Sequence, residues 1–137
     1  MTDAATTELA MLVWTVALCG ILWVPYILAR MMVWGLVDTV GYPDNPPPLP
    51  GWAQRAQRTH LNLVENLAVF APLVLIVHVT GTANEVTAFA ASLFFWARIA
   101  HAVIFIARIP WLRTLAFLAG FAALVILFVE LVRAGIA

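Results

Sequence analysis

The chain has 137 residues and no formal net charge at pH 7; 64% of its residues are hydrophobic and 10% are charged. Its mean hydropathy of +0.99 excludes an ordinary soluble domain and indicates one small integral membrane domain occupying residues 1–137. All 7 basic residues are arginine, and without an excess of positive charge nucleic acid is not an expected partner.

The first apolar segment, Leu9–Ala29, contains no charged residue and is long enough to cross a hydrocarbon core about 30 Å thick. Acidic rather than basic residues precede it, and its apolar run is too long for a signal peptide, so we expect a membrane span. Pro25 predicts a kink, and Arg30 is expected to close the span at the interface. Residues 42–52 are rich in proline and predict an extended loop. We interpret it as a stiff connector; a proline-rich ligand for a signalling domain is the alternative.

Three further apolar segments follow: Trp52–Val79, Val86–Ile109 and Leu112–Val132. Residues Gly81–Asn84 predict a tight turn that ends in a helix N-cap, and Pro110 is expected to end the third segment. Because backbone groups facing lipid must be hydrogen-bonded within the protein, the segments are expected to be helices rather than strands. The predicted fold is an all-α membrane protein, a bundle of four transmembrane helices.

The arginines are distributed unevenly among the loops. The second loop has none and the C-terminal end has only Arg133, whereas the first and third loops are flanked by Arg30, Arg55, Arg58, Arg108 and Arg113. Basic residues favour the cytoplasmic side of a membrane. We therefore expect a multi-pass protein of the inner or cell membrane, with the first and third loops in the cytoplasm and both termini outside it.

Three polar residues share one face of the second predicted helix. At about 100° per residue, Arg58, Asn62 and Glu65 fall within an arc of about 60° and span about 10 Å along the axis. Ionisable groups within a membrane helix are costly unless paired, which makes this polar ladder a candidate functional site. The alternative is a network between helices that sets their register.

The third helix carries a similar set. Arg98, His101 and Phe105 have i, i+3, i+7 spacing, and Arg113 follows at the start of the fourth helix. Guanidinium groups pair with carboxylates in a bidentate manner, so the combined set suits an anionic ligand that also carries an amine. Glu65 would then bind the ammonium group or hold an arginine in place.

These segments resemble a known family. The segment Arg58–Asn66 resembles the signature of the MAPEG proteins, the membrane-associated proteins of eicosanoid and glutathione metabolism. The residues of this segment that carry the resemblance are Arg58, His60, Asn62, Glu65 and Asn66. The segments Trp96–Ala102 and Ile109–Thr114 resemble the third-helix and loop motifs of the bacterial branch of that family. The resemblance extends over essentially the whole chain in length, number of spans and spacing.

The resemblance implies a homotrimer of four-helix subunits that binds glutathione between neighbouring subunits near the cytosolic face. The residues implied in glutathione binding are Arg58, Asn62 and Glu65, with Arg98, His101 and Arg30. Arg113 would stand near the thiol as the catalytic residue. The implied activity is that of a glutathione-dependent transferase or peroxidase acting on hydrophobic electrophiles from the lipid bilayer, and no metal is implied.

One residue departs from the family pattern. Relatives often carry a tyrosine seven residues after the third-helix arginine, whereas this chain has Phe105, which cannot donate a hydrogen bond. The difference favours an alternative in which the same fold is a non-catalytic scaffold that binds lipid or a thiol. A small multidrug exporter also has four short helices, but the first helix lacks the carboxylate that proton coupling would need, so this alternative ranks last.

Overall fold

The computed structural model describes residues 3–136, with side chains from residue 7 onward. This part of the chain forms helices and no strand: α1 (Asp3–Leu22), α2 (Val24–Val40), α3 (Gly51–Thr80), α4 (Glu85–Ile106) and α5 (Pro110–Arg133). Because α2 continues α1, the segments long and apolar enough to cross a membrane number 4: Thr7–Val40, Gly51–Thr80, Glu85–Ile106 and Pro110–Arg133. The predicted all-α membrane bundle of four spans is confirmed.

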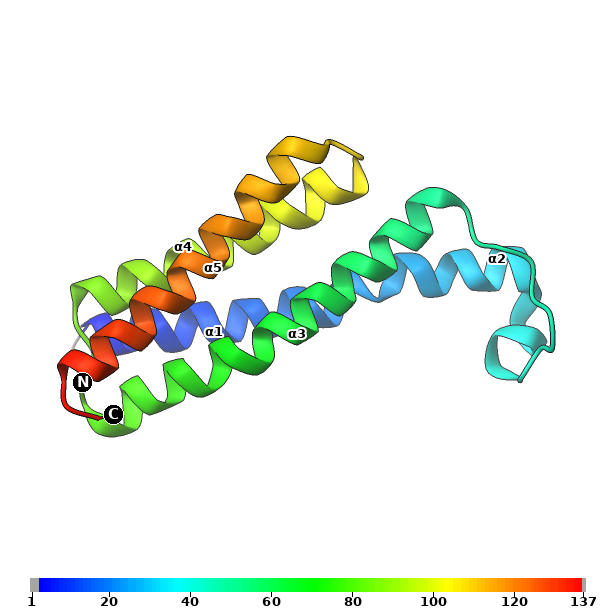
Figure 1. The fold of residues 1–137 in the computed structure, drawn as a ribbon. Coiled ribbons are helices and arrows are strands. Elements are labelled where there is room, and N and C mark those ends of the chain that lie inside the picture. The colour runs from blue at the N-terminus through cyan, green and yellow to red at the C-terminus, as the bar shows by residue number, and fades with distance from the viewer. Residues whose placement is uncertain (1–2, 137) are drawn as a thin grey trace.

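The spans lie side by side in an elongated bundle (Figure 1). α4 and α5 form a hairpin, while α1 packs against both α3 and α4. α2 packs against α3 and extends beyond the tip of the α4–α5 hairpin. Both ends of the described chain lie at one end of the bundle, and the first and third loops lie toward the other, as an even number of spans requires.

The first span is interrupted beside Pro25, where a kink was predicted, and it differs from its prediction at Arg30. The helix is interrupted at Trp23, and α2 then begins with Pro25 in its first turn, where the missing N–H removes no hydrogen bond. The helix continues past Arg30 to Val40, so the prediction that Arg30 closes the span is wrong. Gly35, with φ 78° and ψ 170°, interrupts α2 because glycine adopts this backbone region without the strain that a Cβ causes.

The proline-rich segment forms no helix between residues 41 and 50, as predicted. The Trp34 indole Nε1 donates a hydrogen bond to the Pro47 carbonyl at 2.7 Å, which ties the loop to α2. Pro50 then caps the start of α3 with φ −52° and ψ 145°, an extended conformation that proline favours.

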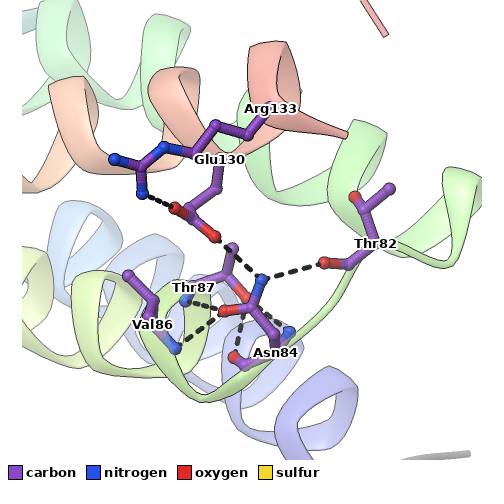
Figure 2. Close-up of polar contacts among 6 residues, drawn as sticks. All are labelled: Thr82, Asn84, Val86, Thr87, Glu130 and Arg133. Atoms are coloured by element: carbon purple, nitrogen blue, oxygen red, sulfur yellow. Dashed lines mark hydrogen bonds and ion pairs between the residues drawn. The ribbon is translucent and has the colours of Figure 1, made fainter. Parts of the chain in front are cut away.

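The turn between α3 and α4 is built on a capping box at Asn84 (Figure 2). Its Oδ1 accepts hydrogen bonds from the backbone N–H of Val86 at 2.8 Å and of Thr87 at 3.0 Å, and the Thr87 hydroxyl accepts one from the Asn84 N–H at 2.8 Å. Asn84 Nδ2 also donates to Glu130 Oε2 at 3.0 Å, and Arg133 Nη1 donates to Glu130 Oε1 at 2.8 Å. The predicted N-cap is confirmed, and it ties the start of α4 to the end of α5.

The connection between α4 and α5 begins earlier than the apolar pattern indicated. α4 ends at Ile106, and Arg108 has a left-handed φ of 64°, which is uncommon for a residue with a Cβ. Pro110 does not end α4; it begins α5, because a proline in the first turn lacks only an N–H that the helix does not use. The short connection keeps α4 and α5 together as a hairpin (Figure 1).

The core of the bundle is apolar and closely packed. Phe70 of α3 and Phe94 of α4 stack with ring centroids 4.0 Å apart, and both are fully buried. Ala90, Ala91 and Ala123 around them also have no exposed surface, and such small side chains let membrane helices approach closely. This packing holds α3 against α4, the two helices that carry most of the predicted site.

A carboxylate is buried in the first span. Glu8 has no exposed surface, and neither of its carboxylate oxygens makes a hydrogen bond within the described part of the chain. The prediction that the first helix lacks a carboxylate, which ranked an exporter last, is therefore wrong. The apolar run alone had placed Glu8 before the span, whereas the helix that contains it begins earlier.

Replacing Asn84 by alanine is expected to destabilise the bundle by about 1 kcal/mol or more, because the cap of α4 and the link to Glu130 are lost together. The measurement is the midpoint of thermal unfolding in detergent. Ser92→Ala is the matched control, since the Ser92 hydroxyl donates to the Ala88 carbonyl of its own helix at 2.9 Å. Equal midpoints for the two variants would contradict this role of Asn84.

Candidate functional site

The polar ladder of α3 lines a hollow of about 350 Å³ between α3 and α4. The residues of this ladder hollow are Arg58, Leu61, Asn62, Glu65, His101 and Phe105. The three ladder residues therefore share one face, as their helical spacing predicts. His101 and Phe105 of α4 line the same hollow, as expected, whereas Arg98 does not.

A second hollow of about 350 Å³ adjoins the first and reaches the loop between α4 and α5. The residues of this arginine hollow are Gly51, Gln54, Arg55, Arg58, Phe105, Arg108 and Arg113. Arg58 and Phe105 line both hollows, so the two form neighbouring parts of one site. Its guanidinium groups gather toward the α4–α5 loop, and its carboxylate, Glu65, lies deeper along α3.

Glu65 is available to a ligand or a neighbouring chain. Its side chain is exposed, and the ion pair found among the side chains of residues 7–136 is the one between Arg133 and Glu130. Within this chain Glu65 thus does not hold Arg58 or Arg98 in place, which was one of its two expected roles. An unpaired carboxylate on a membrane helix is costly, so it favours a partner from outside the subunit.

Arg98 points away from the ladder hollow. Its side chain is 2% exposed, Nη1 donates to Asn62 Oδ1 at 3.1 Å, and Nη2 donates to the Phe117 carbonyl of α5 at 3.2 Å. The guanidinium carbon lies 5.1 Å from the ring centroid of Phe94 and 5.3 Å from that of Phe117. The i, i+3, i+7 spacing placed Arg98 on the face of His101, but the side chain extends across to α5. Within one subunit Arg98 belongs to a network between helices.

His101 and Phe105 form the α4 wall of the site. Their ring centroids lie 5.5 Å apart, and His101 is 5% exposed. The Arg113 guanidinium carbon lies 4.8 Å from the centroid of the Phe105 ring, close enough for a cation–π interaction. Phe105 has no hydroxyl, and in this structure its ring supports Arg113.

Arg30 lies apart from both hollows and is not one of their lining residues. Its guanidinium carbon is 5.5 Å from the Tyr26 ring centroid and 5.3 Å from the Trp34 ring centroid, all within α2. The structure thus brings Arg58, Asn62, Glu65, His101 and Arg113 to one site and leaves Arg30 on a different surface.

Two arginines of the site were missed as candidates, because the sequence used them only to predict topology. Arg55 Nε donates to the Ile106 carbonyl at 2.9 Å and so links α3 to the end of α4. Arg108 lines the arginine hollow from the α4–α5 loop. The available signal for Arg55 was its position three residues before Arg58, which puts both on one face of α3. The position of Arg108 in the sequence gives no comparable indication that it belongs to the site.

The arrangement defines a class of protein: an integral membrane bundle with a polar site suited to a small molecule that bears both anionic and cationic groups. The sequence model of the MAPEG family matches residues 11–133, which extend into all four spans and include every predicted site residue, and the chain belongs to this family. No curated protein matches the chain significantly. Its assignment to the bacterial branch stays a prediction.

Proposed function

We propose that the protein is a membrane-bound, glutathione-dependent transferase or peroxidase that acts on hydrophobic electrophiles. The observation that carries the proposal is the convergence of Arg58, Asn62 and Glu65 on one hollow that adjoins the hollow of Arg113. Membership of the MAPEG family supports glutathione as the thiol.

Glutathione has two carboxylates, one ammonium group and one thiol, and the site offers a group for each. Arg58 would pair with a carboxylate, Asn62 would bond to a peptide or carboxylate group, and Glu65 would bind the ammonium group. His101 lines the same hollow and would contact the ligand from α4. Arg30 and Arg98 are the two expected residues that do not line this site within one chain. The part of Arg30 in glutathione binding stays a prediction for the assembled protein.

Arg113 would supply the chemistry. A free thiol has a pKa of about 8.5, so only a small fraction is thiolate at neutral pH. A guanidinium group nearby favours the thiolate and lowers the pKa of the thiol. The thiolate would donate its electron pair to the electrophilic carbon or peroxide oxygen of the second substrate, and the bond to the leaving group would break with its electron pair.

An apolar groove supports a hydrophobic second substrate. This groove, of about 350 Å³, lies between α3 and α5 and meets the ladder hollow at Glu65, which lines both. Its residues are Glu65, Asn66, Val69, Leu73, Phe121, Leu124, Val125 and Phe128. A molecule dissolved in the bilayer could approach the polar site along such a surface.

The second candidate function is a non-catalytic scaffold that binds lipid or a thiol. Two observations favour it: Phe105 cannot donate a hydrogen bond to a thiolate, and Arg98 is engaged between helices. Binding of glutathione without turnover of any electrophile would select this alternative.

The protein is expected to assemble as a homotrimer. Arg58 and Glu65 are exposed on a membrane helix without an ion-pair partner among the side chains of residues 7–136, and a neighbouring subunit would cover them. Native mass spectrometry in mild detergent measures the assembly directly. A population containing only monomers or dimers, confirmed by cross-linking in membranes, would contradict the trimer.

The first and third loops are expected to be cytoplasmic, because the arginines gather beside them. The test uses single cysteines, Asn45→Cys in the first loop and Ala83→Cys in the second, each in a Cys19→Ala background. In intact cells a membrane-impermeant thiol reagent should label residue 83 and leave residue 45 protected until the cells are lysed. The reverse pattern would invert the proposed topology.

The proposed chemistry is tested by equilibrium binding of glutathione to the purified protein, followed by a pH titration of thiolate absorbance. Arg113→Ala should raise the pKa of the bound thiol by about 1 or more, which reduces the thiolate fraction at neutral pH about tenfold, and turnover should fall with it. Glu65→Gln should weaken binding without raising the pKa of the thiol, since a carboxylate opposes the thiolate.

Arg133→Ala is the matched control, because Arg133 pairs with Glu130 at the opposite end of the bundle. An unchanged thiol pKa in the Arg113→Ala protein would remove Arg113 from the catalytic role. A parent protein that binds no glutathione would contradict the proposed function as a whole.

A further inference from the structure

The guanidinium of Arg98 occupies a space that exists because residue 120 is glycine. A Cβ built on Gly120 would overlap Arg98 Nη2 and would lie 2.7 Å from both Nε and Cζ of Arg98. Gly120 is buried within α5 and has ordinary helical geometry, so its backbone does not require glycine. Glycine is required at position 120 because the Arg98 side chain, which crosses from α4, occupies the place of a Cβ.

Arg98 determines which way the carboxamide of Asn62 faces. A guanidinium group can only donate hydrogen bonds, so the Asn62 atom 3.1 Å from Arg98 Nη1 must be the carbonyl oxygen Oδ1. The NH2 group of the same carboxamide is then directed away from Arg98. Since Asn62 lines the ladder hollow, its two N–H groups are the ones available to a ligand there.

The two hydrogen bonds of Arg98 link three helices, but linking helices does not by itself require a buried charge. Arg98 Nε is buried without a hydrogen-bond partner within the described chain, and a charged group in an apolar bundle is costly. The other contacts, with the Phe117 carbonyl and the Phe94 and Phe117 rings, hold the guanidinium in one place. The free-energy cost of burying this guanidinium is explained if its position is needed to hold the Asn62 carboxamide in one orientation.

We propose that Arg98 and Gly120 are positioning residues, which hold the carboxamide of Asn62 with its NH2 group toward the ladder hollow. The inference rests on the proposed function for the identity of the ligand, but not for the orientation itself. It assigns Arg98 an indirect role: Arg98 acts through Asn62 and does not itself touch glutathione. It also assigns a role to Gly120, which spacing alone would place among helix-packing residues.

Gly120→Ala is the first test. The added methyl group displaces the guanidinium, so the Asn62 carboxamide is no longer held with its NH2 group toward the ladder hollow. Loss of one oriented hydrogen bond should weaken glutathione binding about fivefold to tenfold in equilibrium dialysis. Gly20→Ala is the matched control, because nothing lies within 4 Å of a Cβ at that position, and it should bind like the parent.

A double-mutant cycle separates positioning from a general packing defect. In an Asn62→Ala background, Gly120→Ala is expected to cause no further loss of affinity, because the group it misorients is already absent. Losses that add in the double variant would show that Gly120 acts on the fold rather than through Asn62, and would overturn the proposal.

The orientation itself is measured without glutathione. In protein labelled with ¹⁵N on asparagine side chains, the NH2 signals of Asn62 are those that Asn62→Asp removes. Gly120→Ala should shift these signals, and Gly20→Ala should not. Arg98→Met, which keeps an unbranched side chain but removes the guanidinium donors, should cause a similar shift and serves if Gly120→Ala does not fold.

The outcomes are distinguishable. A parent that binds no glutathione contradicts the proposed function, while a shift of the Asn62 signals in Gly120→Ala and Arg98→Met still supports the positioning role. Unchanged Asn62 signals in both folded variants overturn the positioning role, whatever the parent binds.

Discussion

The buried guanidinium of Arg98 is the interaction on which the register of the helices depends. A membrane bundle offers it no bulk water, so its N–H groups must find acceptors on neighbouring helices. Those acceptors are the Asn62 side chain on α3 and the Phe117 carbonyl on α5, while Arg98 itself belongs to α4. Two hydrogen bonds therefore hold three helices in one register, and that register places the polar ladder of α3 opposite His101 and Phe105.

The two ends of the bundle use their charges differently. At the end that holds the α3–α4 turn, Glu130 is satisfied by Asn84 and Arg133 within the subunit (Figure 2). In the site, Glu65 and Arg58 line a hollow without forming an ion pair among the described residues. Unneutralised charge costs stability, and proteins tend to accept such a cost at functional sites. The contrast distinguishes a polar cluster that completes the fold from one that is open to a ligand.

Phe105 limits the interactions that the α4 wall of the site can offer to a thiol. An aromatic face without a hydroxyl can orient a cation but cannot donate a hydrogen bond to sulfur. The ring lies beneath Arg113 and beside His101, at the junction of the two hollows. Under the proposed function, stabilisation of the thiolate would therefore depend on the guanidinium rather than on a phenol.

The sequence by itself determined the number of spans, the shared face of Arg58, Asn62 and Glu65, and the cap at Asn84. Each of these depends on properties of one segment at a time: apolar length, the helical period, and the residue that precedes a helix. Local reasoning was wrong about Pro110, because a proline near a helix boundary is compatible with ending one helix or beginning the next.

Only the tertiary structure decided where the long side chains point. Arg98 turns toward Gly120 of α5 rather than into the hollow, and Arg30 remains apart from it. Arg55 and Arg108 join the site because the α4–α5 loop lies against the start of α3. The direction of a side chain several bonds long depends on the space that a neighbouring helix leaves open, and the spacing of residues along one helix contains no information about that space.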